Sequence, residues 1–419
     1  MGNCCCDPAT NGLESPSQPS SSSRRPSGLV RLFLVGMGEA GKSTVIKQMQ
    51  KLCSPAENPH GRRQRYTLYD EHWRPIDDPF SEPIRRPKRY AVVIRQNILR
   101  GIGTLIQQAD HYGYPYANDK LRSYAREVVD HLEGSCEASS FYQREATLSE
   151  SLAVKISLLW QAKNSPVRKT LEHRKDFFVS DATEYFLEHD KLMEVAKEGY
   201  LPSADDIIRA RDPTTGVASY NFGLRNLKVN VHDMGGQPVE RARWPTHIDS
   251  WLRQAQPGDR NFVLFVAALS DYNQIHPRHP NKTLLEESVA LLQTLLDSSQ
   301  LRSCGFLVFL NKRDVFEAKL YQYNDFDDYL ARMERRPDHS SSIGNRLSRL
   351  LPQRATTLER AEKAVEALFL KALSESRRAD DTALHCRFTC AVDTQMMESI
   401  LEAVHDEIIS AAATEYSLW

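Results

Sequence analysis

The segment GMGEAGKST at residues 36–44 constrains the fold of this 419-residue chain more than any other feature. It fits the pattern GxxxxGK[ST], in which glycines let backbone N–H groups point inward at phosphate oxygens. An apolar run, residues 29–35, precedes it and a helical pattern, residues 44–51, follows it, so we predict a strand, a loop and a helix. In this phosphate loop, Lys42 can reach the β- and γ-phosphates of a nucleotide, and the Ser43 hydroxyl can ligate Mg²⁺.

The bulk composition narrows the functional class. Hydrophobic residues make up 41% of the chain, charged residues 26%, and the formal net charge is -1, which is ordinary for a globular protein and does not favour nucleic-acid binding. No apolar run reaches the roughly 18 residues that span a bilayer, and no apolar signal core is present. The eight cysteines lack paired CxxC spacing, so we expect neither a zinc site nor a disulfide framework. Cys304, Cys386 and Cys390 adjoin apolar runs and are expected in the core.

The first half of the chain divides by composition. Residues 1–28 are expected to be a disordered tail, because the Ser- and Pro-rich part cannot bury enough apolar surface to order itself. Residues 29–53 form the first part of a nucleotide-binding domain, and the proline-rich residues 54–88 are predicted to be a surface insertion. Residues 89–204 carry helical periodicity, such as the stripe Ile94, Ile98, Ile102 and Ile106, and are predicted to form an inserted all-α domain.

The second half returns to strands. Apolar runs at 217–222, 227–232, 262–267, 306–310 and 387–390 alternate with helical stretches such as 284–296 and 397–409. This pattern predicts an α/β fold with a mostly parallel sheet covered on both faces. Residues 205–419 are therefore assigned to the second part of the nucleotide-binding domain, with a polar variable insertion at about 334–380.

A second motif, DMGGQ, begins at Asp233 at the end of a predicted strand. The Asp233 carboxylate can hold Mg²⁺ through a water, Gly236 can offer a backbone N–H to the γ-phosphate, and Gln237 can orient an attacking water.

Two further motifs concern the base. Asn311-Lys312-Arg313-Asp314 follows an apolar run, and a carboxylate there accepts hydrogen bonds from guanine but is left unpaired by adenine. Thr389-Cys390-Ala391 follows the last predicted strand, where the Ala391 N–H would meet guanine O6. Both motifs favour GTP over the alternative of an ATP-using enzyme.

Together with residues 206–216 and 233–244, which are similar to two switch segments, these motifs resemble the α subunit of heterotrimeric G proteins. The resemblance implies a Ras-like P-loop GTPase fold with an inserted helical domain, membrane receptors that read residues 415–419, and an unidentified effector and hydrolysis-accelerating regulator. It also implies that Arg211 is a built-in arginine finger, that Gln237 and Glu39 complete the catalytic set, and that Thr214 joins Ser43 as a ligand of Mg²⁺.

The nucleotide-binding residues implied in this way are Gly36, Gly38, Glu39, Ala40, Gly41, Lys42, Ser43, Thr44, Asp181, Ile208, Arg209, Arg211, Thr214, Asp233, Gly236, Gln237, Asn311, Lys312, Asp314, Cys390 and Ala391. Arg241 and Glu287 match a pair that locks the second switch when GTP is bound.

The chain departs from the family pattern at several places. Residues 7–28 lack the apolar stripe of the helix that docks the βγ dimer, so we expect weak or absent βγ binding. Ala40 replaces a usual serine, and Pro238 follows Gln237, biasing its backbone away from the α region. We expect Pro238 to slow hydrolysis by misplacing Gln237, the alternative being that it only stiffens the loop. The alternative function is a nucleotide-gated binding module with negligible turnover.

The N-terminus predicts a lipid anchor. Gly2 is a candidate for myristate, and Cys4, Cys5 and Cys6 are candidates for palmitate. Because two acyl chains hold a protein at a bilayer where one binds only marginally, we expect a place on the inner leaflet, at the cytoplasmic face of the plasma membrane.

Overall fold

The computed structural model describes residues 28–54, 65–80, 87–134, 147–334, 356–376 and 384–416. The acylation candidates Gly2, Cys4, Cys5 and Cys6 lie outside these residues, as do the predicted tail up to residue 27 and the last three residues of the chain. Among the described helices, none is both long and apolar enough to cross a membrane.

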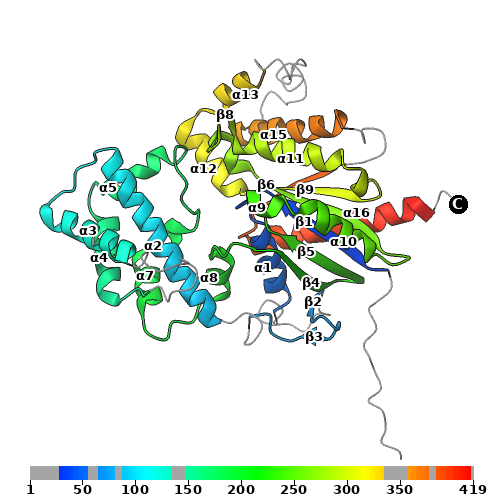
Figure 1. Ribbon diagram of the computed structural model, residues 1–419, viewed down its shortest axis with the longest axis horizontal. Coiled ribbons are helices and arrows are strands. Elements are labelled where there is room, and N and C mark those ends of the chain that lie inside the picture. Colours follow the sequence, from blue (N-terminus) through cyan, green and yellow to red (C-terminus); the bar gives the residue numbers. More distant parts are fainter. Residues whose placement is uncertain are drawn as a thin grey trace, which may run out of the picture.

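An eight-stranded sheet organises one side of the molecule (Figure 1). Its strand order is β10-β9-β6-β1-β5-β4-β2-β3. The strands are β1 (Val30–Gly36), β2 (Tyr66–Tyr69), β3 (Pro75–Ile76), β4 (Val217–Leu224), β5 (Leu227–Met234), β6 (Arg260–Ala268), β9 (Gly305–Asn311) and β10 (Leu384–Phe388). The pairs of β1 with β5 and β6, of β6 with β9 and of β9 with β10 are parallel. The predicted mostly parallel α/β sheet is thereby confirmed, and its parallel strands end at one common edge.

Helices cover both faces of this sheet. One face packs against α1 (Lys42–Leu52) and α16 (Thr394–Tyr416), and the other against α10 (Trp244–Arg253), α11 (Leu284–Leu296), α12 (Arg313–Tyr323), α13 (Phe326–Glu334) and α15 (Thr357–Ser374). All seven residues of the central strand β1 are buried, as expected for a strand covered on both sides. Cys304, Cys386 and Cys390 are buried as predicted.

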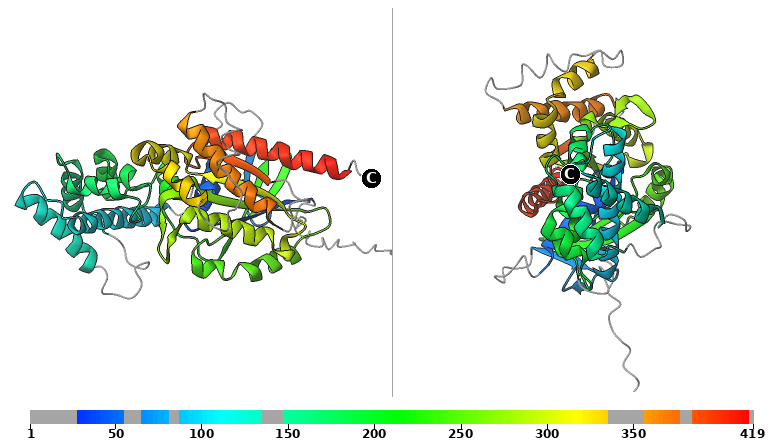
Figure 2. Two further views of the ribbon diagram at one scale, coloured as in Figure 1. Left: turned by 90° about the horizontal axis from the view of Figure 1, so that it is seen from above. Right: turned by 90° about the vertical axis from the view of Figure 1, so that its left-hand side faces the viewer.

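A second, separate core lies beside the sheet (Figure 2). Its helices are α2 (Pro87–His111), α3 (Asp119–Gly134), α4 (Glu150–Gln161), α5 (Pro166–Lys169), the short 3-10 helix η2 (Thr170–His173), α6 (Thr183–Leu187) and α7 (His189–Ala196), and α8 (Ala204–Arg209) leads back toward the sheet. The predicted isoleucine stripe on α2 is confirmed, because Ile94, Ile98, Ile102 and Ile106 are all at most 1% exposed. The apolar faces of these helices pack against one another.

The prediction of a surface insertion at 54–88 was wrong in part. Strand β2 pairs antiparallel with β4, and β3 pairs with β2, so this segment extends the main sheet. Tyr66 and Leu68 are buried, whereas Thr67 and Tyr69 are only partly buried, which is the alternation of a strand with one face in the core. Four residues are too few for that alternation to stand out among the prolines and charges around them.

The prediction of a variable insertion at about 334–380 was also wrong in part. Residues 335–355 and 377–383 are outside the described residues, but α15 between them packs into the sheet's core. It begins with a capping box, in which Thr356 and Glu359 each bond the other's backbone N–H. Phe369 on α15 is fully buried, 6.5 Å from Phe265 of β6 between ring centroids.

Replacing Phe369 with alanine tests this placement. We expect Phe369→Ala to lower the free energy of unfolding by about 3–5 kcal/mol, because it leaves a cavity in the core. The neighbouring Leu370 is 42% exposed, so Leu370→Ala should change it by less than about 1 kcal/mol. Equal midpoints for the two variants in chemical denaturation would contradict a core role for α15.

Candidate nucleotide-binding site

A cavity of about 310 Å³ opens where the parallel strands end. Of the predicted nucleotide-binding residues, 17 line it: Gly38, Glu39, Gly41, Lys42, Ser43, Thr44, Asp181, Ile208, Arg209, Arg211, Thr214, Gly236, Gln237, Asn311, Lys312, Asp314 and Ala391. Gly36, Ala40, Asp233 and Cys390 do not line it. The wall also contains residues that the motifs did not indicate, among them Lys47, Tyr185 and Val392.

The phosphate loop has the backbone that its glycines predict. Gly41 sits at φ 100° and Glu39 at φ 69°, both in the left-handed region that disfavours ordinary side chains. Lys42, which begins α1, donates to the carbonyl oxygens of Gly36 (3.0 Å) and Met37 (2.8 Å). Burial lowers the pKa of Lys42 to about 8, although Asp233 opposes that shift. The Lys42 ammonium group is thus bound by two carbonyl oxygens of the loop, and phosphate oxygens could take their place.

The three predicted magnesium-site residues meet at one point. The hydroxyls of Ser43 and Thr214 are 2.7 Å apart, and Asp233 Oδ2 accepts from both, at 3.1 and 3.2 Å. Asp233 Oδ1 is buried without a hydrogen-bond partner among the described residues. Burial raises the pKa of Asp233, while Lys42 and the two hydroxyls oppose the rise. This set of hard oxygen donors with an unused carboxylate oxygen fits Mg²⁺.

The second switch segment lies against the phosphate loop. Gln237 has an extended backbone (φ -67°, ψ 152°), and Pro238 takes the first position of α9 (Pro238–Arg241), where its missing N–H does no harm. The predicted bias of Pro238 on its neighbour is confirmed. A Cβ added at Gly38 would come within 2.7 Å of Gln237 Nε2, so this glycine lets the glutamine amide approach the loop.

One ion pair and one hydrogen bond tie the second switch segment to its surroundings. Arg241 reaches Glu287 of α11 at 3.1 Å, as predicted. Glu240 accepts from the backbone N–H of Gly216 at 3.0 Å, which joins the two switch segments. Nothing in the motifs indicated Glu240, because its role depends on a neighbour 24 residues away along the chain.

Arg211 is held from three sides. It pairs with Glu39, and its guanidinium lies 4.9 Å from the centroid of the Phe178 ring. The side chain of Asn97, on α2, accepts from the Arg211 N–H at 2.7 Å and donates to its carbonyl at 3.0 Å. Burial raises the pKa of Glu39 to about 7, against the effect of Arg211 and Lys312. Asn97 was missed by sequence reasoning, since a lone asparagine on a helix carries no signal.

Asn311 connects the loops at the base end of the cavity. Its Nδ2 donates to the Ala40 carbonyl at 2.9 Å, and its Oδ1 accepts from the Thr389 hydroxyl and the Ala391 N–H, each at 3.0 Å. The guanine contact predicted for that N–H stays a prediction. Asp314 lines the cavity beside Cys390, and burial raises the pKa of the Cys390 thiol to about 11, with Asp314 adding to the rise.

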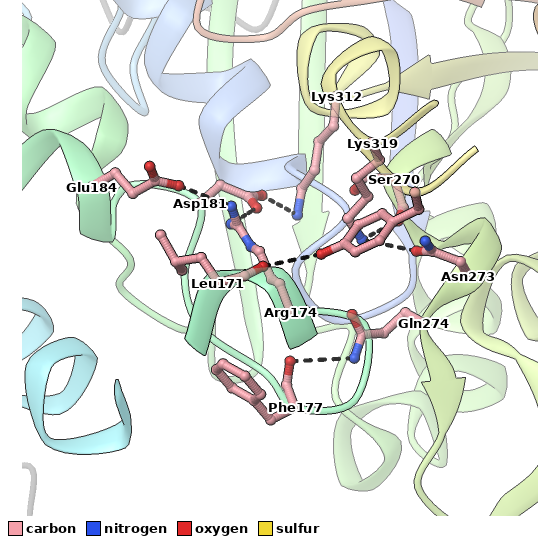
Figure 3. A network of polar contacts seen from close by, with 11 residues as sticks. Leu171, Arg174, Phe177, Asp181, Glu184, Ser270, Asn273, Gln274, Lys312 and Lys319 are labelled. Carbon is pink, nitrogen blue, oxygen red and sulfur yellow. Dashed lines mark hydrogen bonds and ion pairs between the residues drawn. The ribbon is translucent and has the colours of Figure 1, made fainter. Parts of the chain in front are cut away.

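A polar network joins the helical layer to the sheet side of the molecule (Figure 3). Asp181 lies between Arg174 at 2.5 Å and Lys312 at 2.7 Å. Burial opposes the charge on Lys312, yet Asp181 and Asp271 raise its pKa above the ordinary value. Beside it, Gln274 donates to the Lys175 carbonyl at 3.1 Å. Asp181 was predicted to face the nucleotide, whereas Arg174 had no motif to indicate it.

This arrangement can be compared with known proteins. A family model described as the G-protein alpha subunit matches residues 11–408. The chain belongs to the G-protein alpha subunit family. It is therefore a GTP-binding signalling protein, and the members of its family are GTPases that couple in general to receptors and βγ.

The curated relatives that it matches have low sequence identity to this chain, but the similarity extends over most of their length. The guanine nucleotide-binding protein subunit alpha-15 of Rattus norvegicus is 27% identical over 394 residues, which covers 93% of this chain and 89% of the relative. That of Oryctolagus cuniculus is 27% identical over 403 residues, covering 94% and 90%. The likeness thus extends over nearly the whole of both chains.

Nucleotide binding should be accompanied by proton uptake near pH 8. Lys42 is about half protonated there, because its pKa is lowered to about 8, and bound phosphate charge raises that pKa again. Calorimetry of GDP binding in buffers of different ionisation enthalpy should show this uptake, and below pH 7 the contribution of Lys42 should vanish.

Lys42→Arg should remove most of the uptake at pH 8, since arginine stays charged. Lys51→Arg, on the same helix but outside the cavity lining, should leave it unchanged. Equal uptake in both variants would contradict the assignment to Lys42.

Proposed function

We propose that this chain binds GTP with Mg²⁺ in the cavity at the strand ends and hydrolyses it with Gln237, Arg211 and Glu39. The observation that carries the proposal is the convergence of Ser43, Thr214 and Asp233 beside buried Lys42. Oxygen donors and a cation at one end of the cavity are what a nucleoside triphosphate requires.

Each side chain has a role that its position supports. Lys42 would exchange its loop carbonyls for phosphate oxygens, and Gly236 would donate its N–H to the γ-phosphate. Ser43 and Thr214 would hold Mg²⁺, with Asp233 acting through a water. The metal would neutralise negative charge on the β- and γ-phosphates. Gln237, at the phosphate loop, would orient the attacking water.

The proposed arginine finger is paired with a carboxylate of the phosphate loop. Arg211 is paired with Glu39, and it must exchange this carboxylate for the γ-phosphate before it can stabilise charge in the transition state. The raised pKa of Glu39 favours that exchange, because a protonated carboxyl holds an arginine less tightly. Glu39 would thus store the finger between turnovers.

Selection of guanine would rest on Asp314. Its carboxylate would accept from the guanine N1–H and exocyclic amine, while Ala391 would donate to O6 after its N–H leaves Asn311. Adenine would leave that carboxylate unpaired, a difference that discriminates strongly between bases.

Pro238 is expected to limit the rate of GTP hydrolysis. We expect Pro238→Arg to hydrolyse GTP faster than the parent in single-turnover assays, because the proline restricts the backbone of the preceding Gln237. Equal rates would remove the proposed constraint. Arg211→Lys should lower the rate by at least about 100-fold.

Multiple-turnover phosphate release separates this proposal from a nucleotide-gated binding module. Catalytic turnover by the parent that is lost in Gln237→Leu supports the hydrolase. Tight GTP binding without turnover would favour the module.

We further propose that the βγ dimer binds weakly or not at all, because residues 7–28 show no apolar stripe for docking it. The GDP form, purified from membranes, should carry less than stoichiometric βγ. As a positive control, a chimera with an amphipathic helix in place of residues 7–28 should recover it. Stoichiometric βγ on the parent would refute this proposal.

A lipid anchor at the inner leaflet and receptor recognition by residues 415–419 complete the proposal. Chemical-reporter labelling should detect myristate that is lost in Gly2→Ala and palmitate that is lost when Cys4, Cys5 and Cys6 become serine. Incorporation that is the same in Cys136→Ser as in the parent controls for specificity. Labelling unaffected by any N-terminal change would contradict the anchor.

A further inference from the structure

The main chain around Arg211 is held by side chains from other elements. Residues 210–215, between α8 and β4, have no regular secondary structure, so their backbone polar groups need partners from elsewhere. Lys47 of α1 donates to the Ala210 carbonyl at 2.7 Å. Asn97 of α2 bonds both the N–H and the carbonyl of Arg211. Two side chains thus take the place of a helix or sheet ladder at these two residues.

The Asn97 amide bonds Arg211 in the way that a neighbouring strand would. Its Oδ1 accepts from the Arg211 N–H at 2.7 Å, and its Nδ2 donates to the Arg211 carbonyl at 3.0 Å. Two bonds of opposite direction to one residue restrict both its position and its orientation. A side chain of the helical layer, 114 positions away along the chain, therefore determines where the Arg211 main chain lies.

The residues on either side are held as well. The guanidinium of Arg209 lies 4.6 Å from the centroid of the Tyr185 ring, and Asp212 pairs with Arg89 of α2 at 2.7 Å. Because the Arg89 side chain is 62% exposed, solvent weakens that pair. The Asn97 contact is the stronger restraint from α2, since it consists of two hydrogen bonds to main-chain groups.

Neither Asn97 bond involves the guanidinium of Arg211. That group pairs with Glu39 and lies over the ring of Phe178. Exchange of the Glu39 carboxylate for a γ-phosphate can therefore proceed by rotation of the arginine side chain, while its main chain stays in place. Such an anchor matters for a catalytic group, because a misplacement of about 1 Å can cost on the order of 100-fold in rate.

Asn97 serves this contact rather than its own helix. Its neighbours Ile94 and Ile98 are fully buried in the helical core, whereas Asn97 is only partly buried. Within the described part of the chain, both side-chain hydrogen bonds of Asn97 go to Arg211. Asparagine is a weaker helix former than alanine. A residue that opposes its local structure and bonds a functional segment is typical of a functional position.

We propose that Asn97 is a positioning residue for GTP hydrolysis. It fixes the main chain of Arg211 so that the guanidinium, once it leaves Glu39, meets the γ-phosphate in the transition state. This inference rests on the proposed function of Arg211 as the finger. Asn97 does not line the nucleotide cavity, so its loss changes the rate of hydrolysis and not the binding of nucleotide in the ground state.

The test compares hydrolysis with binding in the full chain. Asn97→Ala should slow single-turnover hydrolysis at least about tenfold, while the dissociation constants of GDP and of a non-hydrolysable GTP analogue stay within about twofold of the parent's. The affinity of the GDP and Mg²⁺ form for aluminium tetrafluoride, which mimics the transferring phosphoryl group, should fall by the same factor as the rate. Gln107→Ala, at an exposed position of the same helix, should match the parent in every measurement.

A second variant and a double-mutant cycle separate positioning from folding. Asn97→Asp has the same size and keeps the acceptor, but it cannot donate to the Arg211 carbonyl. It should therefore slow hydrolysis even where the alanine variant folds poorly. In an Arg211→Ala background, both substitutions at Asn97 should have no further effect on the rate, because the group that Asn97 positions is gone.

Distinct results would overturn the inference. Parent-like rates in both Asn97 variants, together with slow hydrolysis by Arg211→Ala, would refute the positioning role and leave the finger standing. A parent-like rate in Arg211→Ala would refute the finger and, with it, this inference. Equal slowing by Asn97→Ala with and without Arg211 would mean that Asn97 acts elsewhere. Loss of GDP affinity in proportion to the rate would show a structural role alone.

Discussion

The buried amide of Asn311 is the interaction on which the nucleotide cavity depends. This side chain is 2% exposed, and its three hydrogen bonds join the phosphate loop after β1 to the loops that follow β9 and β10. A buried amide with fewer partners would carry the full cost of desolvation. Three loops far apart in sequence are thereby joined through one side chain.

Around this centre, the molecule brings opposite charges together across a boundary between two cores. Asp181 and Arg174 come from the helical layer and Lys312 from the end of β9. Each charge has a partner of opposite sign within 2.7 Å, so charge-assisted hydrogen bonds join the two layers. The same boundary contains Arg211, which is held by Glu39 on the sheet side and by Asn97 on the helical side. A change in how the two layers meet would therefore move Arg211.

The local motifs could be predicted because the residues that carry their chemistry are adjacent in the sequence. Gly41, Lys42 and Ser43 form their geometry within a few residues of backbone, so a pattern predicts them. Asn97, Arg174 and Glu240 could not be predicted, because each is an ordinary polar residue until the fold places a partner beside it. The segments 66–69 and 357–374 were misjudged for a different reason. Their short or flanked apolar patterns were outweighed by the polar, proline-rich sequence around them.

The sequence by itself determined the family, the order of the phosphate, switch and base motifs, and the mostly parallel sheet, because strand and helix periodicities are local properties of the chain. The tertiary structure decided which side chains share a cavity. It placed the Ser43, Thr214 and Asp233 oxygens together and paired Arg211 with Glu39. The Ser43 contacts join residues more than a hundred positions apart, and only the tertiary fold brings such residues within bonding distance.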